Sequence, residues 1–588
     1  MHVELALATL NSAIIFFYSG WTNTAMVCLV LFCICDIDAL SLLPSPAGFF
    51  FPLFGAEAAI HTDPHGPHSL EISWIRTLRT SILTYPSLLG SQTLFIADPV
   101  AAPVAAALPM TPLETRIANM LLGDEGIITS GPGSKHHRRM RKALGPAFTS
   151  LSLAPLAPVL RRHALGLVEG IKYRLEMQNQ HSSERNTILD VVPWINAVAF
   201  DILAEGGLGY ESGCVARLRA GAGNIPKDPL AAAFDATNAA FASQAPVTQV
   251  LQTFLGYLFP SLATSSLFAR NRAIKTNRKR MEQLARQLIE KRAVTATAAA
   301  QNEPPTSPLT ATHTSSSPSS STGYTDFVSR LMFHPRTGRS LLATTSEADK
   351  KVLVAQINAF LFAGHETTSS ALSWLIYALV SDPSFQTRLF HAIQHLDLES
   401  AAAHPLVEAG VKEGLRLFPP ARVLRRVAAP GAGGDVILPL AQAVPGTGGR
   451  KWLVVPRGQN IVIGLAALNR SKEIWGEDAD EFKPERWLNV PDSHTDAHLP
   501  FDLASFGFGP KTCIGARFAL LELKTLTACL VQHFRFSIAP SPGKAAAGAG
   551  ATIDIVSRQA LFFRPVVRGQ ERRGSQLPVL VAMRGERD

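Results

Sequence analysis

The chain has 588 residues, of which 47% are hydrophobic and 17% are charged, which is sufficient for a large core and somewhat apolar for a soluble enzyme. Its net charge of +9 is not accompanied by zinc-finger spacing, an aromatic RNA-binding pattern or a basic zipper, so it predicts a docking face for an acidic protein or an anionic membrane and no nucleic-acid partner. The six cysteines lack the spacing of a disulfide framework, which excludes a disulfide scaffold and predicts a reducing compartment.

The N-terminal segment has no charged residue from Leu5 to Cys35. One tilted transmembrane helix fits into this stretch, and two short apolar segments in a hairpin are the alternative. A cleaved signal peptide is disfavoured because the first residues include Glu4 and neither Lys nor Arg. We therefore predict a membrane anchor over residues 1–43, a proline-rich hinge over residues 44–55, and one large domain over residues 56–588.

Helical patterns dominate from Pro112 onward, and the densest basic cluster of the chain lies at residues 135–142. Such a cluster is usually a solvated helix face, although His137 and Arg141 could also bind carboxylates. Residues 275–292 predict a second, strongly basic helix. The following stretch, residues 294–322, consists mainly of Thr, Ser, Ala and Pro, which predicts a disordered insertion within the domain.

Residues 351–380 predict one long apolar helix that contains a polar notch at residues 363–368. A membrane span is disfavoured because Glu366 would lie within the bilayer, where a charge is costly. In the notch, Gly364 follows Ala363 and narrows the helix, and Thr367 can hydrogen-bond back to a carbonyl. A carboxylic acid next to an alcohol can relay protons, so we predict catalytic roles for Glu366 and Thr367.

Two shorter segments carry charges that can pair. Glu413 and Arg416 are three residues apart on one predicted helix, an arrangement that is usually a solvated surface pair. Residues 417–420 follow with the sequence Leu-Phe-Pro-Pro, and residues 482–487 include Arg486. Between these segments, residues 437–440 and 452–455 predict a small β-sheet.

The segment from Phe506 to Gly515 frames Cys513 with glycines. Gly509 permits a backbone bend, and Gly515 permits a close approach of the main chain to a large ring. A helix is predicted immediately afterwards, so the sulfur would lie at a helix N-terminus, which favours the thiolate. Lys511 could reach an acidic group on the edge of such a ring. This pattern favours a cysteine thiolate held against a flat metal macrocycle over an inert buried cysteine.

In this order, the five motifs at residues 137–141, 363–368, 413–416, 482–487 and 506–515 resemble those of the cytochrome P450 superfamily. The resemblance implies a mainly α (α+β) fold with small β-sheets. It also implies that Cys513 is the axial ligand of haem iron, and that Glu413, Arg416 and Arg486 form a buried structural network. The residues that it implies around the haem are Phe506, Gly509, Lys511, Gly515, His137, Arg141, Arg426, Ala363 and Gly364. The chain departs from the usual pattern at Lys511, where Arg or His is typical, and at His137, where Trp is typical.

By the same resemblance, the expected cofactor is haem b and the expected activity is that of a microsomal monooxygenase, which inserts one atom of O2 into a lipophilic small molecule. The electrons would come from NADPH through NADPH-cytochrome P450 reductase, with cytochrome b5 as a further candidate partner. The resemblance also implies an endoplasmic reticulum membrane location with the catalytic domain facing the cytosol. A haem-thiolate isomerase or peroxygenase acting on hydroperoxides without NADPH, and a non-enzymatic haem sensor, are the alternatives. The Glu366–Thr367 pair counts against the first, and the second would need a signalling module.

Overall fold

The computed structural model describes residues 69–87, 91–179, 187–221, 228–242, 261–302, 346–428, 435–488, 503–541, 552–559 and 562–585, with short pieces before residue 69, between residues 252 and 259, and at 327–328. Most of the predicted anchor and hinge, and residues 303–322 of the predicted insertion, lie outside these residues. Within the part that is described, no single helix has both the length and the apolar character of a membrane span. One bent pair, Lys135–Phe148 with Ser150–Gln178, meets both criteria together.

The described residues are mostly helical, which confirms the predicted fold class. The α-helices are α4 (Ser69–Leu78), α5 (Ala101–Ala106), α6 (Pro112–Leu122), α7 (Lys135–Leu144), α8 (Ser150–Leu153), α9 (Ala157–Asn179), α10 (Val192–Ile202), α11 (Cys214–Ala220), α12 (Pro229–Ala242), α14 (Ala269–Asn302), α16 (Glu347–Ser381), α17 (Pro383–Ile393), α18 (Leu398–Ala402), α19 (Pro405–Leu417), α20 (Leu465–Asn469), α21 (Lys472–Trp475) and α22 (Ala516–His533). A π-helical segment, η5 (Leu203–Gly207), continues α10.

Four small sheets accompany the helices. The largest has the order β1-β2-β7-β4, in which β2 and β7 are parallel and the other pairs are antiparallel. The remaining sheets are β3-β11-β8, β5-β6 and β10-β9, all antiparallel. The strands are β1 (Ile82–Pro86), β2 (Gln92–Ile96), β3 (Thr187–Asp190), β4 (Val423–Val427), β5 (Val436–Pro439), β6 (Trp452–Val455), β7 (Asn460–Gly464), β8 (Phe534–Ile538), β9 (Ile555–Gln559), β10 (Phe563–Val567) and β11 (Pro578–Met583). The β5-β6 pair is the small sheet predicted at residues 437–440 and 452–455.

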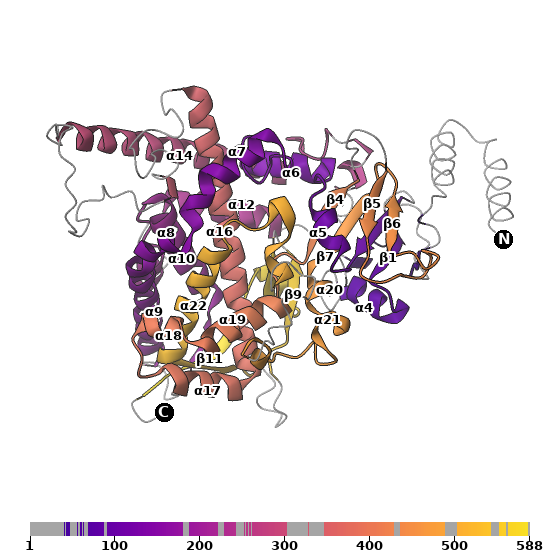
Figure 1. Cartoon of the computed structure of the whole chain (residues 1–588). Coiled ribbons are helices and arrows are strands. Elements are labelled where there is room, and N and C mark those ends of the chain that lie inside the picture. Colours follow the sequence, from indigo (N-terminus) through magenta and orange to yellow (C-terminus); the bar gives the residue numbers. More distant parts are fainter. Residues whose placement is uncertain are drawn as a thin grey trace, which may run out of the picture.

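Helix α16 runs through the centre of the helical part, with α22 and α19 beside it, while β1 and β4 to β7 gather on the right of the view (Figure 1). Ser346 caps the start of this helix, because its hydroxyl accepts a hydrogen bond from the backbone N–H of Asp349 at 3.1 Å. Such a cap satisfies one of the free N–H groups at a helix start. Most of α16 from Leu353 to Val380 is buried. A largely apolar sequence therefore forms a core helix, as predicted.

The predicted disordered insertion differs from the structure at its start. Helix α14 continues to Asn302, so residues 294–302 are helical rather than part of an irregular segment. Residues 297–301 have the sequence Thr-Ala-Ala-Ala-Gln. Ala and Gln favour the helix, which is the physical reason that the helix outlasts the basic segment.

Candidate functional site

Cys513 lies in the loop between the 3-10 helix η9 (Gly509–Lys511) and helix α22. Its backbone N–H donates to the carbonyl of Phe506 at 2.8 Å, which closes the loop. Gly507 and Gly509 have φ angles of +70° and +61°, in the left-handed region that glycine adopts without strain. Gly515 caps the N-terminus of α22, so Cys513 lies two residues before that cap. Phe506 is half-buried against the core.

Two opposing influences act on the thiol of Cys513, whose side chain is exposed. Desolvation by the surrounding protein is the larger influence and raises its pKa above the ordinary value, while a hydrogen bond from the backbone N–H of Gly515 and the charge of Arg141 offset part of this rise. Cys529 is buried, and burial raises its pKa to about 12. Among the cysteines that the structure describes, Cys513 thus combines access with neighbours that favour the thiolate.

Cations gather next to this loop. Arg141, on α7, donates from Nη1 to the carbonyl of Thr512 at 2.8 Å. Arg426, on β4, is buried and donates from Nε to the carbonyl of Ala106 at 3.2 Å. Burial lowers the pKa of Lys511 to about 8, and the charges of Arg426 and Arg141 contribute to this shift. Lys511 is therefore close enough to both arginines to be repelled by them.

His137, on α7 with Arg141, is buried with 2% of its surface exposed. Its pKa is lowered to about 4, mainly by desolvation and further by the charges of Lys511 and Arg141. The imidazole is therefore neutral near pH 7 and can bind a carboxylate as a hydrogen-bond donor rather than as a cation.

Lys511 has acceptors that were not predicted for it. Its Nζ donates to the backbone carbonyls of Ile127 at 2.8 Å and Ile128 at 3.0 Å, and to that of Ser130. An ammonium group has three N–H donors, and these three carbonyls use all of them. In the described geometry, Lys511 fastens the Cys513 loop to the turn before α7 rather than presenting its donors to a ring-bound acid.

On α16, Ala363, Gly364 and Thr367 are half-buried, whereas His365 and Glu366 are buried. The Thr367 hydroxyl donates to the carbonyl of Ala363 at 2.5 Å, which is the predicted back-bond within the helix. A Cβ atom added to Gly364 would lie 2.9 Å from both Cδ atoms of Leu203 in η5. The glycine thus allows the close approach of η5 to α16.

Glu366 is held by an ion pair that the sequence did not indicate. Its Oε2 accepts from Arg564 Nη2 at 2.6 Å and Nε at 3.0 Å, and its Oε1 accepts from the Asn238 amide. Arg564 also donates to the Asn196 side chain at 2.9 Å. His365 binds the Asn196 carbonyl through Nε2 at 2.9 Å. These side chains line a cavity of about 410 Å³ together with residues of α10, α11 and α12.

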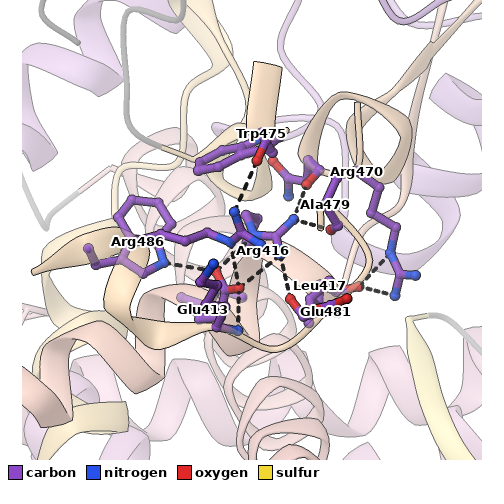
Figure 2. Close-up of polar contacts among 12 residues, drawn as sticks. Glu413, Arg416, Leu417, Arg470, Trp475, Ala479, Glu481 and Arg486 are labelled. Atoms are coloured by element: carbon purple, nitrogen blue, oxygen red, sulfur yellow. Dashed lines mark hydrogen bonds and ion pairs between the residues drawn. The ribbon is translucent and has the colours of Figure 1, made fainter. Parts of the chain in front are cut away.

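The structure also brings Glu413, Arg416 and Arg486 together in a buried cluster (Figure 2). Arg416 donates from Nε and Nη2 to the two carboxylate oxygens of Glu413, each at 2.8 Å, and neither residue has exposed surface. Its other donors bind the carbonyls of Asn469, Ala479 and Glu481 at 2.6 to 3.0 Å. Every guanidinium N–H therefore has a partner, as a buried charge requires.

Arg486 completes the cluster from the other side. It donates from Nε to Glu413 at 3.1 Å and from Nη1 to the carbonyl of Trp475 at 3.0 Å. The Glu413 carboxylate also accepts from Trp487 Nε1 at 2.9 Å and from the backbone N–H of Lys483 at 2.8 Å. The cluster thus pins the irregular segment 475–487 to helix α19.

Comparison with known proteins adds a second line of support. Residues 113–547 match the family described as Cytochrome P450. The chain belongs to the cytochrome P450 family. It is 30% identical over 473 residues to Cytochrome P450 monooxygenase 205 of Postia placenta, with 78% of each chain covered. It is 27% identical to Cytochrome P450 monooxygenase claQ of Ampulloclitocybe clavipes, covering 84% of this chain and 85% of the relative.

A third relative, Ganoderic acid synthetase CYP5150L8 of Ganoderma lucidum, is 28% identical over 71% of this chain and 75% of the relative. Two of these three relatives are named monooxygenases. The chain is therefore an enzyme of an oxidoreductase family, as predicted.

Cytochromes P450 carry haem, and the residues present suit that group. An accessible thiol at a helix N-terminus is a suitable iron ligand. Beside it, the charges of Arg141 and Arg426 repel Lys511, and two carboxylates of a bound ring would offset these positive charges. In the described part of the chain, the charge of Glu114 raises the pKa of Arg426, but burial has the larger effect and lowers it.

Some residues of this P450 site were missed by the sequence analysis. Arg564 and Asn238, which hold Glu366, lie 198 and 128 positions away along the chain. Trp487, which binds Glu413, was recognised only as part of a motif. The available signal for Trp487 was that residues 482–487 form the companion motif of residues 413–416. No local signal marked Arg564.

Proposed function

We propose that the protein is a haem-thiolate monooxygenase of lipophilic small molecules, with Cys513 as the axial ligand of the iron. The observation that carries this proposal is the accessible Cys513 thiol at the N-terminus of α22, beside Arg141. When bound, haem supplies the reductive activation of O2 and the transfer of one oxygen atom. The residues of the chain hold this group, orient it and supply protons.

Arg141, Arg426 and neutral His137 are the residues that we propose for the haem carboxylates. Arg141 is half-buried and has one Nη bound to the Cys513 loop, so it can bridge the loop and a carboxylate. The positive φ of Gly509 bends the loop, and Gly515 caps helix α22 behind it. Ala363, Gly364 and Thr367 form the half-exposed stripe of α16. Lys511 would bind a carboxylate only by exchanging one of its three carbonyl partners.

We propose that Thr367 and Glu366 deliver protons for oxygen activation. Thr367 lies on the half-exposed stripe of α16, and Glu366 lies next to it against the cavity that Arg564 and His365 also line. An acid and an alcohol at adjacent positions can connect water in that cavity with the opposite face of the helix. A T367V variant keeps the volume and removes the hydroxyl, so it should release more of the consumed electrons as peroxide.

A lipophilic substrate is supported by the apolar side chains near this stripe. Phe362 on α16 lies with its ring centroid 6.5 Å from that of Phe562, which directly precedes β10, and 6.2 Å from that of Phe234 on α12. One relative is named for the synthesis of ganoderic acid. We further propose NADPH and a flavoprotein reductase as the electron source, cytochrome b5 as a second candidate donor, and an endoplasmic reticulum anchor over residues 1–43.

The test uses the full chain in detergent. The reduced carbon monoxide complex should show the thiolate-type Soret band, and NADPH with a reductase should drive substrate oxidation. C513S should lose the thiolate-type band and the activity. C529S is the matched control: Cys529 is buried within α22, and the charge that acts on its thiol is that of Lys172 rather than Arg141, so the band should stay unchanged. A C513S variant that retained the band would refute the assignment, and turnover without NADPH would favour an isomerase.

A further inference from the structure

Asn469 is the last residue of α20 and has no exposed surface. Its backbone carbonyl accepts a hydrogen bond from Arg416 Nη1 at 2.7 Å, so it belongs to the buried charge cluster. Its side chain points to another segment of the chain. There, Nδ2 donates to Ser505 Oγ at 2.8 Å, and Oδ1 accepts from the backbone N–H of Ala504 at 3.2 Å.

Both partners, the Ser505 hydroxyl as acceptor and the Ala504 N–H as donor, belong to the 3-10 helix η8 (Ala504–Phe506). The residue before η8, Leu503, provides no side-chain cap. The first N–H groups of a helix have no partner within the helix. The side-chain oxygen Oδ1 of Asn469 therefore caps η8 from outside, in a place where water has no access.

The η8 helix leads directly into the Cys513 loop. Its last residue, Phe506, accepts the backbone N–H of Cys513 at 2.8 Å. Ser505 is fixed a second time, because its hydroxyl donates to the carbonyl of Leu415 on α19 at 2.7 Å. Hydrogen bonds thus link Arg416 to Asn469, Asn469 to η8 and Phe506 of η8 to Cys513, with the covalent chain joining them within Asn469 and within η8.

We propose that Asn469 is a positioning residue for the cysteine ligand, transmitting the rigidity of the Glu413–Arg416 cluster to the Cys513 loop. This inference rests on the proposed function in one respect, namely that Cys513 binds the haem iron. A buried amide with both ends bound to η8 restricts where that helix can lie. Removing the amide would leave the N–H of Ala504 without a partner in the protein interior and would free the start of the loop.

The experiment compares N469A and S505A with N271A in the haem-loaded full chain. Asn271 is a matched control because it is equally buried and its Nδ2 donates to two carbonyls, those of Ala263 and Ser265, each at 2.9 Å. It lies on α14, which shares no hydrogen bond with the Cys513 loop among those described. All three variants should lose stability, but only the first two should change the ligand.

The ligand is read from the reduced carbon monoxide complex as the ratio of the thiolate-type to the thiol-type Soret band, together with haem bound per folded chain. For N469A, we expect the ratio to fall by about tenfold, the change that losing one or two buried hydrogen bonds produces. S505A removes the partner of Nδ2 and the Ser505–Leu415 hydrogen bond but leaves the Ala504 contact, so its ratio should fall as well. The double variant should lose less than the two single changes added together, because both remove the contact between Nδ2 and Oγ.

An N469A ratio equal to that of N271A would overturn the inference. If N469A does not fold, S505A decides, and an unchanged S505A ratio has the same meaning. A wild-type protein without the thiolate-type band would instead refute the assignment of Cys513, so the two failures can be distinguished.

Discussion

Arg564 Nη2 lies 2.6 Å from Glu366 Oε2, and their side chains are only 8% and 3% exposed. The two residues come from β10 and α16, and the pair is completed by hydrogen bonds to Asn196 and Ser369. A buried ion pair contributes little net stability compared with apolar residues, but removing one partner leaves an uncompensated charge. The acid proposed for proton delivery is therefore held in place by a strand whose arginine lies 198 positions further along the sequence.

Replacing Arg564 by Met should destabilise the protein by about 3–5 kcal/mol, because Glu366 would remain buried without its cation. The double variant E366Q/R564M should recover part of this loss, since no buried charge remains. Denaturant unfolding followed by tryptophan fluorescence measures both. R568M is the control: Arg568 pairs with Asp554 at the surface, where such pairs contribute no more than about 1 kcal/mol. Equal losses for R564M and R568M would contradict the buried ion pair.

Replacing Trp487 by Phe should cost about 1.5–3 kcal/mol, because its indole N–H donates to the Glu413 carboxylate and hydrogen bonds to charged groups are the stronger ones. W475F provides the comparison, since Trp475 Nε1 donates to the neutral carbonyl of Leu468 at 3.1 Å. That loss should be about 0.5–1.5 kcal/mol. Thermal unfolding of the two variants side by side measures the difference, and a larger loss for W475F would count against the importance of the Glu413 contact.

His137 should make the stability of the haem-free protein depend on pH. Its pKa lies at about 4 in the folded protein and near 6.5 in the unfolded chain. Between these values the unfolded chain binds a proton that the folded protein does not, so stability falls as the pH decreases from 6.5 toward 4. The H137F variant should lack this part of the pH dependence.

The thermal midpoint of wild type and H137F between pH 7 and pH 4.5 measures this effect. Haem carboxylates next to His137 would raise its pKa, so the difference between the two proteins should shrink when haem is bound. Parallel curves for the two haem-free proteins would contradict the low pKa of His137.

Replacing Gly364 by Ala should destabilise the protein by about 1–3 kcal/mol, because the new methyl group would lie 2.9 Å from Leu203. The double variant G364A/L203A should be less destabilised than the sum of its single changes, since the smaller side chain makes room. G166A, on helix α9, is the control: a Cβ there meets nothing within 4 Å. It should stabilise the protein by up to about 1 kcal/mol through helix propensity. Thermal unfolding measures all four variants, and a neutral G364A would show that η5 can shift.

Much of the site was visible in the sequence because its features are local. The glycines around Cys513, the apolar run of α16 with its notch, and the spacing of Glu413 and Arg416 on one helix face each involve neighbouring residues. Backbone propensity and helix periodicity act over such distances, so the loop, the core helix and the i,i+3 pair could be predicted from their own segments.

The partners of these features depended on the tertiary structure. Lys511 reaches carbonyls more than 380 positions away, Arg564 reaches Glu366 over 198 positions, and Asn469 reaches Ser505 over 36 positions. No periodicity links such positions, because their contacts arise only when helices and strands pack. The sequence by itself therefore determined the family motifs and the central helix. Packing decided that Lys511 binds the turn before α7, that Glu366 pairs with Arg564, and that Asn469 joins the charge cluster to the Cys513 loop. The physical reason is that a buried polar group binds whichever partner the fold brings within reach.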